Sequence, residues 1–262
     1  MLQALNTAAT GMKVQELTVD NISHNLSNAN TTGFKKSRLE FEDMLYINMG
    51  NSEGQADTEA RVFSELQMGS GARTVSNLKT FAQGPLEETQ RELDVAIEGE
   101  GFFQLQYQEN EIRYTRDGSF KIDSQRKLVS SHGYPLEPGI TIPENTSKIY
   151  IGRDGTVSVS IQGQNQLQTV GEIQLARFAN PSGLSSEGSN IYKQTTASGE
   201  AILNKPGANG NGSLCQNLLE RSNVDVVNEM VRLITAQRAY EINSKVIRSG
   251  DEMLSMVNNL VR

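Results

Sequence analysis

The feature that most constrains the fold is a seven-residue apolar repeat near the end of the chain, in residues 222–262. Two neighbouring lanes carry it, one formed by Val226, Leu233, Tyr240, Ile247, Leu254 and Val261, the other by Ala239, Val246, Met253 and Leu260. No proline interrupts the segment, and Asn223 followed by Asp225 is suited to a helix start. The pattern predicts a long amphipathic helix that packs lengthwise on other helices, rather than a single surface helix on a globular core.

Residues 1–29 have the same period. The lanes here are Leu5, Met12, Val19 and Leu26, with Ala8, Ile22 and Ala29 beside them. They predict a second helix, and nothing comparable lies between the two ends. Helices that share a period are natural partners for each other, or for copies of themselves in neighbouring subunits. Because the first helix is too short to cover the last one, we expect other subunits to cover the rest.

Polar residues follow the first helix. Residues 28–36 are rich in Asn and Thr and contain Gly33, a composition that ends helices. Asn21, Asn25 and Asn28 lie at helical spacing, so their amides are suited to bridging the following turn, although a solvated polar face explains the spacing equally well. A polar run over residues 48–59 predicts a long surface loop, and residues 61–93 look extended and weakly patterned.

From Asp94 the apolar period changes to two. Short runs such as 101–107, 112–115 and 156–161 read as strands, and Asp117-Gly118 and Asp154-Gly155 are hairpin signals between them. We therefore expect an inserted all-β domain of antiparallel hairpins over residues 94–180. The glycine-rich residues 181–221 predict a return path with little regular structure.

These readings predict a discontinuous α+β chain. Its parts are a terminal helical domain (1–35 and 222–262), extended connections (36–93 and 181–221, with a loop at about 46–66) and the β domain (94–180). The long terminal helices are expected to pack in the manner of a coiled coil, as a strip of tube wall.

The composition of the chain argues against several classes of partner, metal site and enzyme activity. A net charge of −7 argues against nucleic acid or an anionic membrane surface as the main partner. Cys215 is the only cysteine and His24 and His132 are the only histidines, which argues against disulfides and against multi-cysteine or histidine-rich metal sites. Asp117 and Asp154 precede glycines in turn positions, where aspartate is structural far more often than catalytic. We find no catalytic constellation, and we expect no enzyme activity and no cofactor.

The N-terminus has neither a basic run nor an unbroken apolar stretch. It therefore resembles neither a cleavable signal peptide nor a membrane span, and we expect a cytosolic protein or one exported without a cleavable signal.

Four segments resemble the bacterial flagellar rod and hook family. They are residues 21–35 (NISHNLSNANTTGFK), 94–103 (DVAIEGEGFF), 114–120 (YTRDGSF) and 237–245 (QRAYEINSK). They span almost the whole chain in the family's order. The chain length suits one inserted β domain, which favours the rod over the longer hook subunit.

The resemblance implies a structural subunit that polymerises helically into the rigid shaft carrying torque from motor to hook. It favours the distal segment of the rod, with the proximal segment as the alternative. A different class, a β-rich binding or hydrolase domain with oligomerising helices, also stays open. The implied partners are other copies of the chain, proximal rod proteins below, hook protein above, the peptidoglycan and outer-membrane ring bushing, and the flagellar type III export apparatus, with no nucleic acid and no membrane insertion.

The expected self-assembly interface combines both termini. From the first part of the chain it contains Leu5, Met12, Val19, Asn21, Asn25, Leu26, Asn28, Gly33 and Phe34. From the last helix it contains Leu233, Gln237, Tyr240, Asn243, Ser244, Ile247, Leu254 and Val261. We expect polar Gln237 and Ser244 to fix register at subunit contacts, residues 48–65 to brace neighbouring subunits, and both helices to fold only on docking.

Overall fold

The computed structural model describes residues 2–48, 67–108, 111–162 and 166–260. The chain divides into two compact units. The terminal unit consists of residues 1–26, 37–78 and 226–262, and the β unit consists of residues 27–36 and 79–225. An N-terminal helix, a central β-rich region and a C-terminal helix confirm the α+β class with two long terminal helices.

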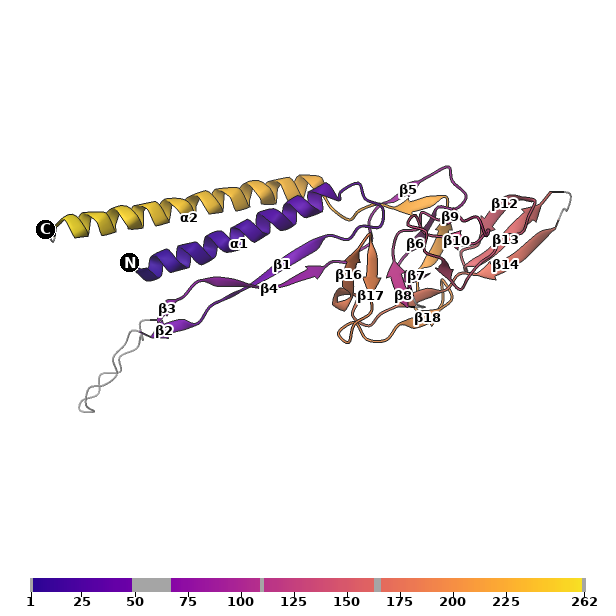
Figure 1. Ribbon diagram of the computed structural model, residues 1–262, viewed down its shortest axis with the longest axis horizontal. Helices are drawn as coiled ribbons and strands as arrows, with labels where there is room; N and C mark the ends of the chain where they lie inside the picture. Colours follow the sequence, from indigo (N-terminus) through magenta and orange to yellow (C-terminus); the bar gives the residue numbers. More distant parts are fainter. Residues whose placement is uncertain (1, 49–66, 109–110, 163–165, 261–262) are drawn as a thin grey trace, which may run out of the picture. The chain divides into compact units, whose positions relative to one another are not determined.

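The terminal unit holds the two helices and two short ladders. Its elements are α1 (Leu2–Ser27), β1 (Ser37–Asp43), β2 (Tyr46–Asn48), β3 (Gln67–Gly69), β4 (Ala72–Lys79) and α2 (Val226–Leu260). The helices lie side by side (Figure 1). β1 pairs with β4, and β2 pairs with β3 antiparallel. Both helices start and end close to the bounds that the heptads predict, and within the described residues neither is long and apolar enough to span a membrane.

The β unit consists of short, mainly antiparallel strands. They are β5 (Leu86–Glu88), β6 (Val95–Glu98), β7 (Phe102–Gln106), β8 (Ile112–Thr115), β9 (Lys121–Ile122), β10 (Leu128–Val129), β11 (Leu136–Glu137), β12 (Thr146–Ile151), β13 (Thr156–Ile161), β14 (Leu167–Glu172), β15 (Leu175–Arg177), β16 (Ser185–Gly188), β17 (Ile191–Lys193), β18 (Ile202–Asn204), β19 (Ser213–Gln216) and β20 (Leu218–Glu220). A 3-10 turn, η2, spans Pro181–Gly183.

Two larger sheets and several strand pairs organise this unit in the described residues. One sheet runs β16-β17-β8-β7-β15-β18, with β11 also pairing with β7. A second runs β12-β13-β14, and β19 pairs with β6 while β20 pairs with β5. The period of two in the sequence produces this arrangement because alternate side chains of each strand point to opposite faces.

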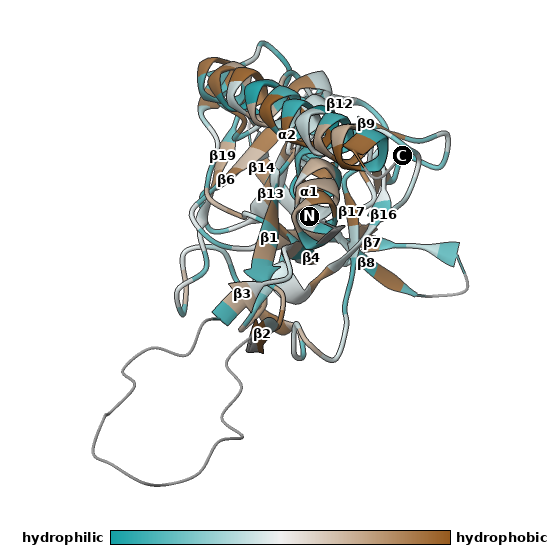
Figure 2. Ribbon diagram, turned by 90° about the vertical axis from the view of Figure 1, so that its left-hand side faces the viewer, coloured by the Kyte–Doolittle hydropathy of each residue, from teal (hydrophilic) through white to brown (hydrophobic). Residues whose placement is uncertain are grey.

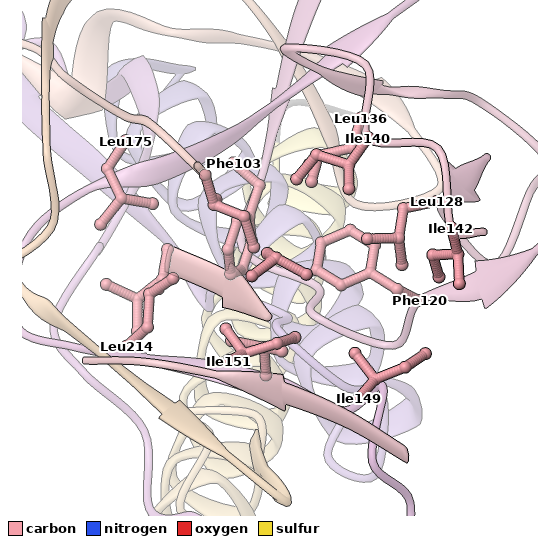
Figure 3. Packing of buried hydrophobic residues seen from close by; sticks show 14 of the residues in the cluster. Phe103, Phe120, Leu128, Leu136, Ile140, Ile142, Ile149, Ile151, Leu175 and Leu214 are labelled. Carbon is pink, nitrogen blue, oxygen red and sulfur yellow. The ribbon is translucent and has the colours of Figure 1, made fainter. Parts of the chain in front are cut away.

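β7 is buried on both faces, which places two cores on its two sides. Phe103 belongs to the larger apolar cluster, where it meets Phe120 edge-on at a centroid distance of 5.0 Å (Figure 3). Phe102, one residue earlier, belongs to a second cluster with Phe178 and Tyr192. Two consecutive phenylalanines thus fill two different cores, because the strand turns them to opposite sides.

Of the two hairpins predicted at Asp-Gly pairs, the structure contains one. Asp154-Gly155 joins β12 to β13, and Gly155 has a φ of 87°, so this hairpin prediction is confirmed. Asp117-Gly118 does not form a hairpin, because β8 pairs with β7 and β17 instead of with the strand that follows. Gly118 is needed there for a different reason: a Cβ at this position would clash with the carbonyl oxygen of Val95.

The prediction of little regular structure in residues 181–221 is wrong. That segment contributes β16 to β20, and Leu214 of β19 lies in the larger core. Residues 61–93 also contribute β3, β4 and β5. The three-part domain boundaries stay a prediction, and the bracing loop at residues 48–65 lies almost wholly outside the described residues.

Candidate assembly interface

α1 and α2 pair antiparallel within the terminal unit. A Cβ at Gly11 would lie 3.0 Å from Asn243 Nδ2, and a Cβ at Gly250 would lie 2.7 Å from Leu5 Cδ2. At the other end of the pair, Asn25 Nδ2 donates to Glu229 Oε2 at 3.4 Å. Moving toward the C-terminus of α2 therefore means moving toward the N-terminus of α1.

The lane of α2 that faces α1 most closely consists of Glu229, Ala236, Asn243 and Gly250. Glu229, Ala236 and Gly250 are the helix's buried residues among those described, and Asn243 packs against Gly11. Only Asn243 of these four is among the residues expected from the sequence. The signal was present, because the four are spaced by seven, but small and polar residues are invisible to a search for apolar repeats.

The apolar residues expected at the interface flank this lane. In α2, Leu233, Ile247 and Leu254 are half-buried, whereas Tyr240 is 44% exposed. In α1, the predicted residues Leu5, Met12, Val19, Asn21 and Leu26 are all half-buried. Their side chains are thus partly covered within one subunit and partly accessible. Val261 lies outside the described residues.

α2 carries apolar side chains that its own unit leaves exposed. Six of them recur along one side of the helix, and we call these six the open strip: Val231, Ile242, Val246, Met253, Val257 and Leu260. Apolar and polar positions alternate along the whole ribbon of α2 (Figure 2). Exposed apolar side chains that recur along one helix face are typical of an interaction surface.

Where α1 begins and α2 ends, α2 extends further along the axis of the pair than α1 does. Leu5 lies beside Gly250, and α1 continues from Leu5 only to Leu2, whereas α2 continues from Gly250 to Leu260. At a rise of about 1.5 Å per residue, α2 extends about 10 Å further (Figure 1). Leu260 in this extension is 84% exposed.

Two of the grooves in the described part of the terminal unit lie between α1 and α2. Val19, Gln237 and Tyr240 line one of 440 Å³, together with the carboxylates Glu16, Asp20 and Glu241. Three predicted residues therefore meet at one surface. The other groove, of 340 Å³, lies between α1, β1 and α2.

Asn25 is used within the subunit. Its amide donates to the carbonyl oxygen of Ser37 at 2.9 Å and accepts from the Ser37 N–H at 3.0 Å, so it ties α1 to the start of β1. The side chain is buried, which makes it a structural link of the terminal unit. This bridging role is one of the two readings that the asparagine spacing left open.

Three passages of the chain are joined in the β unit by a network that we call the clasp, formed by residues 30–36, 80–85 and 220–223. Gly33 N–H donates to the Glu220 carbonyl oxygen at 2.8 Å, and Thr80 N–H donates to the Lys36 carbonyl oxygen at 2.9 Å. The Asn223 side chain accepts from Lys36 N–H at 2.8 Å and donates to the Thr80 carbonyl oxygen at 2.8 Å. One asparagine, expected from the sequence at a helix start, thus connects all three passages.

A buried ion pair lies in the clasp. Lys35 Nζ is 2.6 Å from Glu220 Oε1, and the two side chains are 0% and 1% exposed. Lys35 also donates to the Ala82 carbonyl oxygen, and Gly84 N–H donates to Glu220 Oε1, both at 2.8 Å. Burial lowers the pKa of Lys35, and the attraction of Glu220 opposes that change. Arg116 lies close by, with its Nε 3.9 Å from Glu220 Oε2.

The three remaining predicted residues follow α1, within or beside the clasp. Gly33 has a φ of 67°, and a Cβ there would lie 2.8 Å from the Asp117 nitrogen, so only glycine fits. Phe34 is buried beneath the Lys79 ammonium, 5.1 Å from the ring centroid. Asn28 accepts a hydrogen bond from Thr31 at 3.2 Å. Gly33 and Phe34 are thus occupied inside the β unit.

Sequence comparisons cover both termini and the β unit. Residues 5–35 match the family described as flagella basal body rod protein, and residues 216–260 match the C-terminal family of the flagellar basal body rod FlgEFG proteins. Residues 96–159 match the D1 domain of the flagellar hook protein FlgE/F/G.

Full-length relatives decide the family. The flagellar basal-body rod protein FlgG of Buchnera aphidicola subsp. Schizaphis graminum is 46% identical over 99% of this chain and 100% of its own length. The chain belongs to the flagellar basal-body rod and hook family. FlgG of Borreliella burgdorferi is 48% identical over the whole of both chains, and FlgG of Caulobacter vibrioides is 45% identical over 99% of both.

The family matches include the structural features described above. The matched N-terminal segment holds most of α1 and continues to Lys35 of the clasp, and the matched C-terminal segment runs from Gln216 through α2. Family membership indicates a structural rod protein that assembles within the flagellar basal body. Among the described residues, no group of three or more His, Cys, Asp or Glu side chains is placed to hold a metal ion.

Proposed function

We propose that the chain is a structural subunit of the distal rod, which polymerises helically into a rigid shaft that transmits torque from the motor to the hook. The observation that carries this proposal is end-to-end similarity, at 45–48% identity, to relatives named flagellar basal-body rod protein FlgG. Similarity over the whole chain supports the same role for every part of it, including both helices and the β unit.

The open strip supports polymerisation. One subunit leaves Val246, Met253 and Leu260 exposed on a face of α2 that lies next to the residues packed on α1. Burying these side chains against other subunits is favourable by about 25 cal/mol per Å² of apolar area. Head-to-tail contacts between different surfaces of one chain generate an open helical filament, which is the geometry of a shaft.

Two polar residues of α2, next to the half-buried Leu233, Ile247 and Leu254, would set the register between neighbouring subunits. Gln237 lines the groove with Tyr240, and Ser244 is half-buried one heptad further along. A polar side chain at a helix seam costs stability but penalises neighbours in the wrong register. We assign both residues to contacts between subunits, together with Tyr240, Ile247 and Leu254.

The proposed location is the rod of the basal body, which spans the periplasm and which the chain would reach through the flagellar type III apparatus. In this role the chain contacts proximal rod proteins below, hook protein above and the ring bushing around it. Export through a narrow channel is compatible with helices that pack fully only after docking.

The alternative within the family is the proximal rod. A different class, a β-rich binding or hydrolase domain, has little support, because no catalytic set was found in the sequence and Asp154 lies in a hairpin turn. We therefore infer no enzymatic activity.

Electron microscopy of the purified protein tests the proposal. We expect straight helical tubes that lengthen with protein concentration, and circular dichroism that gains helical signal as the tubes form. Short, self-limited oligomers would favour the proximal rod. A protein that stays monomeric at high concentration, with fully formed helices, would contradict the polymer.

A further inference from the structure

The clasp is formed by segments that are distant in sequence but lead directly into the two helices. α1 ends at Ser27 and α2 begins at Val226, while the clasp joins residues 30–36 to residues 220–223. Arg221 Nη2 also donates to Asn30 Oδ1 at 3.0 Å, on the exposed side of the network. The chain just after α1 and the chain just before α2 are therefore bonded to each other inside the β unit.

Because of the buried charges, the three passages of the clasp are expected to come apart together and not one at a time. Lys35 and Glu220 come from different passages, and the third passage supplies the Ala82 carbonyl oxygen and the Gly84 N–H that complete their hydrogen bonds. A buried charge that loses its partner is strongly unfavourable, whereas a fully bonded pair is tolerated. Pulling out any one passage would leave a buried charge without its bonds, so the three passages hold or separate together.

All of these bonds belong to the β unit, whose core does not depend on the helices. The large apolar clusters and the clasp contain only residues of that unit. The clasp thus has its support from the β unit, not from the pairing of α1 with α2.

We propose that the clasp, through Lys35, Glu220 and Asn223, holds the roots of the two helices together in the free subunit and thereby prepares them for pairing. We call these three positioning residues for assembly. This step rests on the proposed function, because it assigns them a role in polymer growth.

The physical consequence is a high effective concentration of one helix for the other. In an open chain, α1 and α2 are separated by nearly the whole β unit, and bringing them together costs loop-closure entropy. With the roots already joined, pairing is an intramolecular zipping that starts at Asn25 and Glu229, the contact nearest the clasp in sequence. The first turn of a helix is unfavourable to form, so a fixed starting point favours pairing of the two helices.

A cross-linking experiment tests the position of the roots directly. In a Cys215→Ser background, Asn30→Cys and Arg221→Cys place two thiols where the exposed side chains now touch. A short bis-maleimide is added to the full-length free subunit, before polymerisation, and the fraction of intramolecular cross-link is measured. We expect most of the protein to be cross-linked.

Three further substitutions separate the clasp from the helix pair. Ala236→Lys disrupts the lane that faces α1, and we expect the cross-linked fraction to stay unchanged. Glu220→Gln and Asn223→Ala disrupt the clasp, and we expect the fraction to fall several-fold. Glu172→Gln is the matched control, because it removes the same charge from an exposed pair with Lys205 in the same unit.

Asn223→Ala guards against the chance that Glu220→Gln unfolds the β unit, since it breaks hydrogen bonds without leaving a buried charge. Tube growth is followed in parallel by light scattering. The proposal expects a several-fold longer lag in both clasp variants, shortened again when the cross-link is made first.

An unchanged cross-linked fraction in a correctly folded Asn223→Ala protein would overturn the proposal, as would loss of the cross-link in Ala236→Lys. A lag that the cross-link does not shorten would also overturn it, by showing that the clasp is structural only. If no variant or parent forms tubes while the cross-linking follows expectation, the distal-rod proposal fails and the joined roots stand.

Discussion

The two units of this chain solve the problem of burying apolar surface in different ways. The β unit encloses Phe103, Leu136 and Ile173 completely, within clusters drawn from many strands. In the terminal unit, α2 buries only small or polar residues, Glu229, Ala236 and Gly250, where it faces α1, and the open strip of α2 stays exposed. The difference indicates that one unit is stable by itself and the other is completed by its neighbours.

The residues where α1 and α2 meet most closely, which we call the contact lane, explain why the helix pair buries little apolar surface. Gly11 and Gly250 allow side chains of the opposite helix to approach closely, but a glycine buries little apolar area of its own. The larger apolar residues flank the lane at half-burial. Close approach therefore fixes the geometry of the pair, while the flanking apolar side chains keep accessible area that other subunits of the proposed polymer would cover.

The largest expected effect is on the self-sufficient unit. Phe103→Ala removes a fully buried ring from the larger core and should lower the free energy of unfolding of the β unit by about 3–5 kcal/mol. Thermal unfolding of the free subunit, followed by its β signal, measures the change. Tyr150→Ala, at an exposed position of the same unit, is the control and should change stability little. Equal effects of the two would contradict a unit stabilised by its core.

The second prediction moves to the terminal unit. Ser244→Asp places a charge at a half-buried seam position and should raise the concentration needed for tube growth by tenfold or more, which corresponds to about 1.4 kcal/mol per subunit. The unfolding midpoint of the β unit should not move. Ser244→Ala nearly keeps the size and introduces no charge, so it should polymerise. Normal growth of the aspartate variant would remove Ser244 from the interface.

The third prediction concerns the closest approach of the two helices. Gly250→Leu would press on the Leu5 side chain, and overpacking of this kind costs about 1–3 kcal/mol. Because the atom that a Cβ at Gly250 would meet, Leu5 Cδ2, is the flexible end of a side chain, Gly250→Ala should be tolerated. It should also gain up to about 1 kcal/mol of helix propensity. Dissociation of preformed tubes on dilution ranks the three proteins. Faster dissociation of the alanine variant than of the leucine variant would exclude this contact.

The smallest predicted effect concerns alkaline pH. Burial raises the pKa of Tyr192 well above its ordinary value near 10, so above pH 10 the unfolded chain loses this proton while the folded β unit keeps it. Stability should therefore fall with rising pH by up to about 1.4 kcal/mol per pH unit from this group. Tyr192→Phe should reduce the slope between pH 10 and 11.

The difference in pH slope between the parent protein and Tyr192→Phe controls for the other groups that titrate in this range. Lys35 acts in the opposite sense, because its lowered pKa makes the folded state release a proton first as the pH approaches 10.5. Its contribution is the same in the parent and in Tyr192→Phe and cancels in the difference. Identical slopes in the two proteins would show that the Tyr192 hydroxyl ionises freely in the folded state.

Much of the fold follows from local pattern. Heptads predicted both helices, and alternation predicted β7, β8 and β13 close to their true positions. The strands in residues 181–221 were missed because they are three or four residues long and are separated by glycines. Their pairing is decided by distant partners, as Leu214 opposite Ile97 shows, and no window of local sequence contains that information.

The candidate site was predicted less completely. Apolar repeats identified which helices meet, but the closest lane contains Glu229 and Gly250, which no hydrophobic search selects. The pair Lys35 and Glu220 was missed because 185 positions separate them and neither belongs to a local charge pattern. A buried ion pair is visible only once the fold brings its members together.

The unequal ends of the helix pair give the subunit a direction. At one end, α2 continues to Leu260 with nothing of α1 beside it, whereas at the other end Asn25 and Glu229 join the two helices almost level. A filament built from such subunits has two chemically different tips, one presenting bare helix and one presenting closed pairs. Incoming subunits meet different surfaces at each tip, so the two tips are expected to grow at different rates.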